Sequence, residues 1–280
     1  MPLSLSNVAI QQFHDTFINK YQASALLGNT TQTVMGARGD AYKFPIQGST
    51  VMDKRGAYQS MVPASDLDYE QKIVTYEDYV NSIMVDIFQA KELEIDALAR
   101  LGRVHALAAQ RTEDQMVIDA LANATLPADN VIQEPGGTNL TVEKLLEATA
   151  ILDANNVDPD NRFLAISASQ KQSLLNQDKT TSSLFVTDKN LEDGQLMSFL
   201  GFKIFTIGNR EEGGLPKSGN IRSCFAWQME SVGRVYSMTP TTEIDWVPVY
   251  QSWATISRMR LGATALLEKG IVEIKCDESA

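Results

Sequence analysis

The segment DIFQAKELEIDALARLGRVHALAAQRTEDQMVIDALANA, residues 86–124, carries the strongest helical pattern in the chain. Its apolar residues recur at steps of three and four, which predicts a helix with one buried face. These residues are Ala90, Leu93, Ala97, Leu101, Val104 and Ala108. An unbroken helix of this span would be about 58 Å long, whereas a compact globule of 280 residues is about 48 Å across. Either the helix breaks, at Gly102 or Thr112, or the molecule is flat and elongated.

Two strand-like segments precede the helix. AYKFPIQGS, residues 41–49, alternates apolar and polar side chains, and a second run, QKIVTYEDYV, begins at Gln71. Between them lies a long polar excursion with a turn signal at residues 53–56. The pattern predicts a long hairpin. Because a two-stranded hairpin is marginal alone in water, it is expected to pack against something else, including another subunit.

The first thirty-five or so residues are typical of an arm. Five apolar residues indicate a short amphipathic helix, and LLGNTTQTVMGARGD, residues 26–40, then reads as irregular chain. The five are Val8, Phe13, Phe17, Ile18 and Tyr21. Such an arm has little core of its own, so we expect a partner surface to hold it.

The segments after residue 124 alternate helix and strand before turning to strands. LTVEKLLEATAILDANN, residues 140–156, predicts a helix with Thr141 as N-cap and an apolar face of Leu145, Leu146, Ala148, Ile151 and Leu152. The further predicted elements are a strand in RFLAISA, a short helix in SQKQSLLNQ, a strand in FKIFTIG, and strands in VPVYQSWATISRMRLGA and GIVEIKC. The middle part is therefore expected to form a separate α/β lobe.

Composition limits the function. A hydrophobic content of 44% is enough for a sizeable core, and no stretch is apolar enough to span a bilayer or to act as a secretion signal. The net charge is −11, and no Lys/Arg cluster exceeds two adjacent residues, which argues against sequence-specific nucleic-acid binding. An acidic surface is compatible with enclosing nucleic acid without gripping it. Cys224 and Cys276 are far apart in sequence and lack metal-type spacing, which predicts reduced, buried thiols.

Glycines in DGQLMSFLGFKIFTIGN, residues 193–209, raise the question of a phosphate loop. Gly194 and Gly201 are separated by six residues instead of the four of a P-loop, and a strand follows them where a helix would be needed. We instead expect the glycines to form a turn that leads into a strand, with Phe202, Ile204 or Phe205 in the core.

Side chains suited to catalysis or metal binding are sparse. His14 and His105 are the only histidines, and His105 is expected on a helix surface. The acidic pairs Asp66/Asp68 and Glu192/Asp193 are interpreted as solvated carboxylates in turns, and Trp227, Trp246 and Trp253 as core or interface anchors. We therefore predict no catalytic site, no cofactor and no metal.

The order of parts resembles the HK97-type major capsid proteins of tailed bacteriophages. Three local stretches are similar to that family: LAAQRTEDQMVIDALAN at the end of the long helix, NRFLAISASQKQSLL, and GQLMSFLGFKIFTIGN. The resemblance implies an α+β fold with an N-arm, a long E-loop hairpin, a spine helix, an α/β A-domain and a P-domain sheet. These parts would fall at residues 1–37, 38–84, 85–124, 125–234 and 235–280.

A capsid role is what the resemblance implies for function. Hexamers and pentamers of the chain would form an icosahedral shell around double-stranded DNA in the virion, after assembly in the host bacterial cytoplasm without a membrane. The implied partners are a portal protein, a decoration protein and a scaffolding protein. The last is expected to be encoded separately, with no N-terminal trimming, because the chain has no room for a scaffolding segment ahead of the arm.

Asp53, Lys54 and Arg55 at the hairpin tip are predicted to make charged contacts with an adjacent subunit, against the alternative of a solvated turn. Some relatives crosslink an E-loop lysine to a neighbour's asparagine. Lys54 is the candidate here, although no motif marks it.

Two other functions are compatible with parts of the pattern. An encapsulin compartment has the same fold, but MPLSLSNVAIQQFHDTFINKY does not resemble the helix with which encapsulins begin. A cytosolic α+β enzyme would form a small oligomer with a pocket of convergent polar groups.

Overall fold

A computed structural model describes residues 25–52, 54, 56, 66–86, 97–133, 136–177, 191–192, 195–196 and 198–279. Its α-helices are α2 (Ala97–Ala122), α3 (Val142–Ala154) and α4 (Ala168–Leu175). Its strands are β1 (Gln32–Met35), β2 (Ala41–Gln47), β3 (Tyr69–Thr75), β4 (Glu77–Asp86), β5 (Val131–Ile132), β6 (Arg162–Ile166), β7 (Leu191–Glu192), β8 (Gln195–Leu196), β9 (Ser198–Phe199), β10 (Phe202–Thr206), β11 (Lys217–Ser218), β12 (Ile221–Gln228), β13 (Val232–Val247), β14 (Ser252–Ala265) and β15 (Ile271–Asp277).

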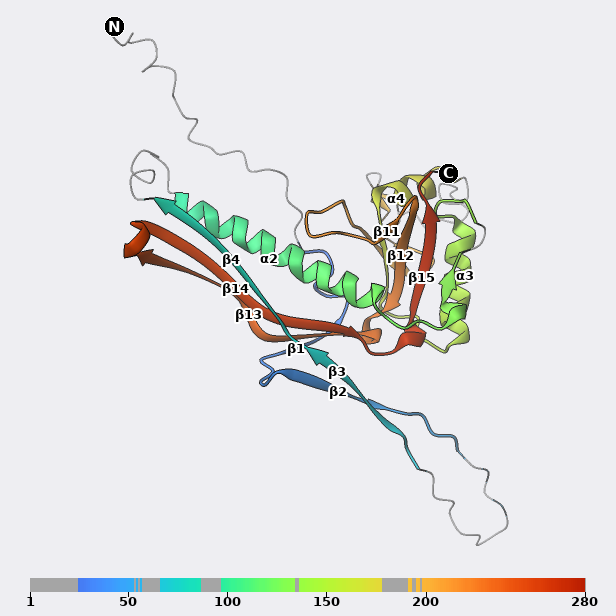
Figure 1. The fold of residues 1–280 in the computed structure, drawn as a ribbon. Coiled ribbons are helices and arrows are strands. Elements are labelled where there is room, and N and C mark those ends of the chain that lie inside the picture. Colours follow the sequence, from blue (N-terminus) through green and yellow to red (C-terminus); the bar gives the residue numbers. More distant parts are fainter. Residues whose placement is uncertain are drawn as a thin grey trace.

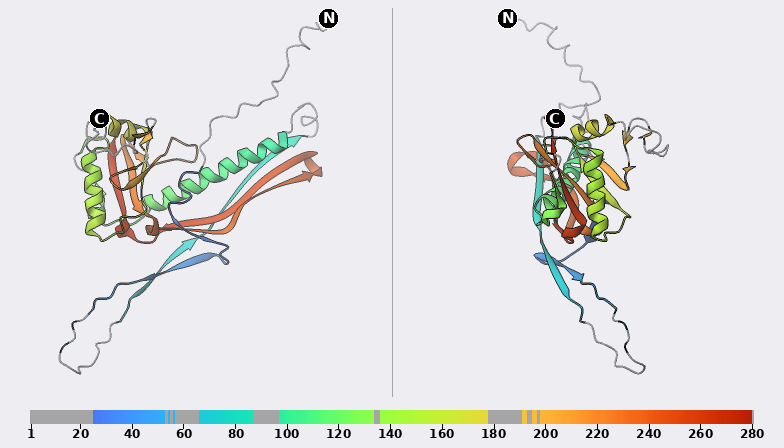
Figure 2. Two further views of the ribbon diagram at one scale, coloured as in Figure 1. Left: turned by 180° about the vertical axis from the view of Figure 1, so that it is seen from behind. Right: turned by 90° about the vertical axis from the view of Figure 1, so that its right-hand side faces the viewer.

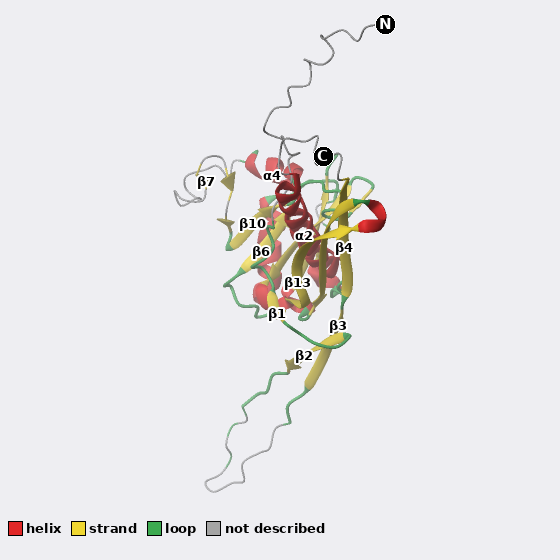
Figure 3. Cartoon of the chain, turned by 90° about the vertical axis from the view of Figure 1, so that its left-hand side faces the viewer, coloured by secondary structure: helices red, strands yellow, loops and turns green. Residues whose placement is uncertain are grey.

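Two sheets organise the molecule. The first has four strands in the order β1-β13-β14-β4, and α2 packs against β13 and β14 (Figure 1). The second has seven strands, in the order β5-β15-β12-β6-β10-β9 with β11 paired to β12. The β2–β3 pair forms a ribbon of its own, which extends away from both sheets (Figure 3). None of the helices described is both long and apolar enough to cross a membrane.

Helix α2 passes through both Gly102 and Thr112 without a break. Its 26 described residues correspond to about 39 Å, and the long β13–β14 pair runs beside it. The helix therefore does not break at either candidate residue, and the body in Figure 2 is elongated. Residues 87–96 lie outside the described part of the chain, as does the side chain of Ala97.

The buried face of α2 differs from the prediction. Leu101, Val104 and Ala108 are only half-buried. The buried residues of the helix are His105, Ala109, Asp114, Met116, Val117, Ile118 and Leu121. The first half of α2 packs against the four-stranded sheet only, whereas its second half also packs into the core of the seven-stranded lobe. The buried surface of the helix is therefore wider toward its C-terminal end than a single stripe.

The seven-stranded sheet and its helices form the predicted α/β lobe. Strand β6 lies between β10, which is parallel to it, and β12, which is antiparallel. The Thr141 hydroxyl accepts a hydrogen bond of 3.3 Å from the Lys144 backbone amide, which confirms Thr141 as the N-cap of α3. Leu146 is 48% exposed, so its place on the apolar face was wrong: it points to the outer side of α3.

Residues 200–201 form the turn that was questioned as a phosphate loop. Leu200 and Gly201 have φ values of 50° and 81°, and they join β9 to β10 as antiparallel neighbours. The left-handed conformation suits glycine because it has no Cβ. Phe202 is fully buried and Ile204 nearly so, which confirms a turn that leads into a core strand.

Four segments differ from their predicted structure or from their predicted place in the fold. The stretch read as irregular contains β1, which pairs in parallel with β13. The run QKIVTYEDYV divides at Tyr76, because β3 pairs with β2 while β4 pairs with β14. Residues 248–250, predicted as strand, form a 3-10 turn that begins at Pro248. Strand β15, which sequence placed among the last strands, joins β12 in the seven-stranded sheet.

Candidate assembly surfaces

The β2–β3 hairpin is a regular antiparallel ladder from the pair Ala41/Thr75 to the pair Gln47/Tyr69. Beyond it, the Gly48 amide donates a hydrogen bond to the Asp68 carbonyl at 2.8 Å. A Cβ at residue 48 would lie 2.9 Å from that carbonyl oxygen, so glycine allows the two chains to approach. The hairpin therefore keeps its paired form past the last ladder residue.

Large apolar side chains are exposed along this hairpin. Tyr69 and Ile73 are 71% and 56% exposed, and Val51 and Met52 toward the tip are 81% and 98% exposed. Apolar surface concentrated on one projecting element is typical of a protein–protein contact. Val51 and Met52 were not singled out from the sequence, because they lie in a mostly polar excursion.

The base of the hairpin is fixed to the four-stranded sheet. Phe44 and Val74 are buried in one cluster with Val235 and Leu266. A Cβ on Gly262 would lie 2.2 Å from the Thr75 carbonyl oxygen, and one on Gly233 would lie 2.9 Å from the Phe44 ring. Two glycines thus let the hairpin cross close above β13 and β14, which sets its direction. Sequence reasoning missed this role because no local pattern distinguishes these glycines.

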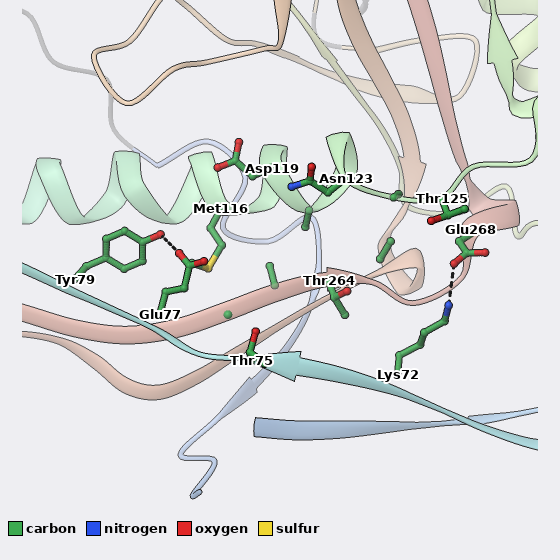
Figure 4. A pocket seen from close by; sticks show the side chains of 15 residues that line it. Lys72, Thr75, Glu77, Tyr79, Met116, Asp119, Asn123, Thr125, Thr264 and Glu268 are labelled. Carbon is green, nitrogen blue, oxygen red and sulfur yellow. Dashed lines mark hydrogen bonds and ion pairs between the residues drawn. The ribbon is translucent and has the colours of Figure 1, made fainter. Parts of the chain in front are cut away.

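A polar pocket of about 350 Å³ lies beside the hairpin base (Figure 4). Lys72 and Glu268 form an ion pair of 2.8 Å at one end, and the Tyr79 hydroxyl donates to Glu77 at 2.5 Å at the other. Burial and the Glu77 carboxylate raise the pKa of Tyr79, so the phenol stays protonated as the donor. Residues of the hairpin, the C-terminal end of α2 and β14 line this pocket.

The tip of the β13–β14 pair is a second exposed apolar surface. Trp246 and Trp253 face each other across the two strands with ring centroids 5.3 Å apart, and both are more than one third exposed. At the turn, Val249 and Tyr250 are 85% and 63% exposed. Trp227, by contrast, is a core residue whose indole nitrogen donates to the Thr30 carbonyl at 2.9 Å. Figure 1 places this tip at the far end of the body from the seven-stranded sheet.

The predicted contact residues at the hairpin tip are only partly visible. Lys54 is exposed, while Asp53 and Arg55 lie outside the described residues. Their contact with a neighbouring subunit therefore stays a prediction.

His105 is buried, with 1% exposure, so its predicted place on the helix surface was wrong. It lies one turn before Ala109, which packs against the sheet, and side chains four residues apart share a face. Burial lowers the pKa of His105, which keeps the ring neutral. His14 lies outside the described residues.

Other reactive side chains are dispersed or buried. Within the described ranges, no group of three or more His, Cys, Asp or Glu residues is arranged to hold a metal ion. Asp66 and Asp68 are exposed, as expected for solvated carboxylates, while Asp193 is outside the described part. Cys224 and Cys276 are free, buried thiols on neighbouring strands, and their mutual hydrogen bond and burial raise the pKa of Cys224. A thiol of raised pKa is a poor nucleophile.

Comparison with known proteins gives one family and several similar structures. A family model described as phage capsid protein matches residues 5–278. No curated protein matches the chain in sequence. The fold is similar to the capsid structure of the cyanophage P-SCSP1u, with a TM-score of 0.75 and 14% identity over 98% of this chain and 94% of that one.

Two further structures are similar over most of their length. The head structure of Helicobacter pylori bacteriophage KHP40 gives a TM-score of 0.77 at 10% identity, covering 95% of both chains. Mycobacterium phage Che8 gives 0.71 at 15% identity, covering 94% of this chain and 95% of that one. At these identities the likeness concerns the fold, and it extends over nearly the whole chain.

Proposed function

The chain belongs to the phage capsid protein family and is a major capsid subunit with an HK97-like fold, and we propose that its copies assemble as hexamers and pentamers into an icosahedral shell around double-stranded DNA. The family match, over residues 5–278, is the observation that carries this proposal. A capsid subunit has a structural role.

Physical features of the subunit support self-assembly. The hairpin and the β13–β14 tip project from the body and expose aromatic and aliphatic side chains that a lone subunit leaves in water. Burying these side chains against neighbouring copies stabilises the particle. It also stabilises the folded subunit, because a partner that binds only the folded state shifts the folding equilibrium toward that state. We propose that Asp53, Lys54 and Arg55 add charged contacts at the hairpin tip.

We propose domain bounds close to those expected from the sequence, with β15 moved from the P-domain to the A-domain. We propose an N-arm up to residue 37, an E-loop over 38–84, a spine helix over 85–124 and an A-domain from residue 125. Strands β13 and β14 are proposed as the P-domain sheet, and β15 as part of the A-domain, since it pairs with β12.

The remaining partners and the location are inferred from the family. We place the protein in the virion, assembled in the host cytoplasm with a separate scaffolding protein and a portal protein, and with a decoration protein on the finished shell. Pull-down from infected cells, followed by mass spectrometry, tests each partner separately. An encapsulin or an enzyme is not favoured, because the chain matches a phage capsid model along nearly its whole length.

The experiment that tests this function is expression of the chain alone and together with the neighbouring phage structural genes, followed by sedimentation in a sucrose gradient. We expect fast-sedimenting particles that contain this chain as the main protein. A protein that stays at the position of a monomer in every combination would contradict the proposal.

A further inference from the structure

The loop between β10 and β11, residues 207–216, lies against α2 and is called the brace loop here (Figure 1). Arg210 Nη1 lies 2.8 Å from Asp114 Oδ2, and Arg111 Nε lies 2.8 Å from Glu212 Oε1. The Gly214 amide donates to Gln115 Oε1 at 2.7 Å. Three polar connections therefore bind a loop of the seven-stranded lobe to the middle of the long helix.

Asp114 also binds the root of the N-terminal arm. Its carboxylate accepts the Leu27 amide at 2.9 Å and the Leu26 amide at 3.1 Å. Asp114 is fully buried, and the Arg210 side chain is 3% exposed. A single buried carboxylate is thus shared by the arm root and the brace loop.

Arg210 depends on this carboxylate. Its Nε and Nη2 atoms are buried without a hydrogen-bond partner among the described residues, so Asp114 supplies its one visible ion pair. A buried carboxylate needs a nearby positive charge and hydrogen-bond donors to offset its loss of hydration. Removing either ionic partner of such a pair leaves the other charge buried and uncompensated. The position of Asp114 is therefore sensitive to both segments.

The brace loop is also fastened at its other end. Arg222 donates from Nη1 to the Leu215 carbonyl at 3.1 Å, and its Nε lies 2.5 Å from Glu278. A continuous polar path thus runs from the arm root through Asp114 and the brace loop to the seven-stranded lobe.

We propose that Asp114 couples the arm root to the brace loop, so that loosening either segment loosens the other. Coupling of this kind is reciprocal. The coupling is confined to Leu26 and Leu27, because the chain after them has other partners. The Thr30 carbonyl accepts a hydrogen bond from the Trp227 indole, and β1 pairs with β13. It is a property of the single subunit and does not require shell assembly. If the proposed shell forms, a neighbour that binds the arm would change the lobe through Asp114.

Hydrogen exchange of the unassembled subunit, read by mass spectrometry with residue-level fragmentation, tests the coupling. In Arg210→Gln we expect the amides of Leu26 and Leu27 to exchange at least about tenfold faster than in the wild type, because their acceptor loses its counter-charge. Amides of β1 should not change. Arg210→Lys, which keeps the charge, should restore most of the protection.

Lys217→Gln is the matched control, since it breaks an ion pair of β11 with Glu278, outside the brace loop, and leaves Arg210, Glu212 and Asp114 untouched. We expect faster exchange near residue 278 and no change in exchange at Leu26 or Leu27. Unchanged exchange at Leu26 and Leu27 in Arg210→Gln, together with a loosened brace loop, would overturn the proposal.

A second variant keeps the test decisive if Arg210→Gln does not fold. Glu212→Gln weakens the loop at its other ion pair and leaves Arg210 and Asp114 in place. Coupling predicts exchange about threefold faster in the loop and at Leu26 and Leu27 alike. A rise confined to the loop would overturn the coupling, whether or not the protein forms shells.

Discussion

At the scale of single residues, Gly262 decides how closely the hairpin lies on the sheet. A methyl group there would meet the Thr75 carbonyl oxygen at 2.2 Å and a Val74 methyl at 2.8 Å. We expect Gly262→Ala to lower the free energy of unfolding by about 2–3 kcal/mol, since overpacking forces backbone to shift. Calorimetry of the unassembled subunit measures this change.

Gly102 provides the matched control for that substitution. It lies inside α2, and a Cβ there would have no atom within 4 Å. Gly102→Ala should therefore raise stability by about 0.5–1 kcal/mol through helix propensity. Equal melting temperatures for the two variants would show that the hairpin does not rest on β14 as described.

Glu278 is the residue from which we expect the clearest pH dependence. Burial alone would raise its pKa, but hydrogen bonds from Lys217, Arg222 and Gln170 outweigh it and lower the pKa to about 2, from an ordinary 4.5. Since the folded-state pKa is depressed, the stabilisation is complete above about pH 4.5 and is lost as the pH falls toward 2.

Glu278→Gln isolates this contribution. We expect it to cost about 2 kcal/mol at neutral pH, as for hydrogen bonds to a charged group, and the difference from the wild type to shrink as the pH falls below 4.5. Urea unfolding at several pH values measures the difference. A difference that is constant down to pH 2 would show that the Glu278 carboxylate is not held in its ionised form.

At the scale of elements, sequence predicted those whose pattern is local. Helix α3 with its Thr141 cap, strand β6, helix α4 and strand β10 each carry their own periodicity, and all were confirmed. The parallel pairing of β1 with β13 was missed, because its polar Gln-Thr-Val-Met segment is held by a strand two hundred residues away. A local sequence pattern does not indicate which distant strand a segment will pair with.

The same limit applies to the surfaces. The charged hairpin tip was noticed because turns have sequence signals, whereas the exposed side chains of Val249 and Tyr250 look like ordinary core residues in sequence. Likewise, His105 looked like a surface residue because its burial depends on how α2 lies against the sheet. Exposure is a tertiary property, and the fold was needed to reveal it.

The tip of the β13–β14 pair gives a prediction about assembly. Val249→Ser with Tyr250→Ser should change the stability of the lone subunit by less than about 0.5 kcal/mol, because both side chains are exposed. Particle yield at a given protein concentration should fall, since apolar contact area is lost. Light scattering during assembly measures the yield.

Leu146→Ser serves as the control for that pair, because Leu146 is also exposed but lies on α3, in the other lobe. Similar yields for the tip variant and the wild type would exclude the tip as an assembly contact. A drop in yield for Leu146→Ser alone would move the contact to the α/β lobe.

At the scale of the whole molecule, shape follows from the arrangement of the two sheets, the long helix and the hairpin. A compact globule of this length would have a radius of gyration of about 19 Å. We expect small-angle X-ray scattering of the unassembled subunit to give a clearly larger value, because α2 and the β13–β14 pair extend the body in one direction and the hairpin in another (Figure 2). A value near 19 Å would contradict the extended form.

Cryo-electron microscopy of purified particles would show whether this chain builds a shell. We predict closed icosahedral particles in which each subunit has the fold described here and its hairpin lies on a neighbouring copy. A monodisperse monomer or small oligomer under all conditions, including co-expression with the scaffolding gene, would show that the chain does not form a capsid shell.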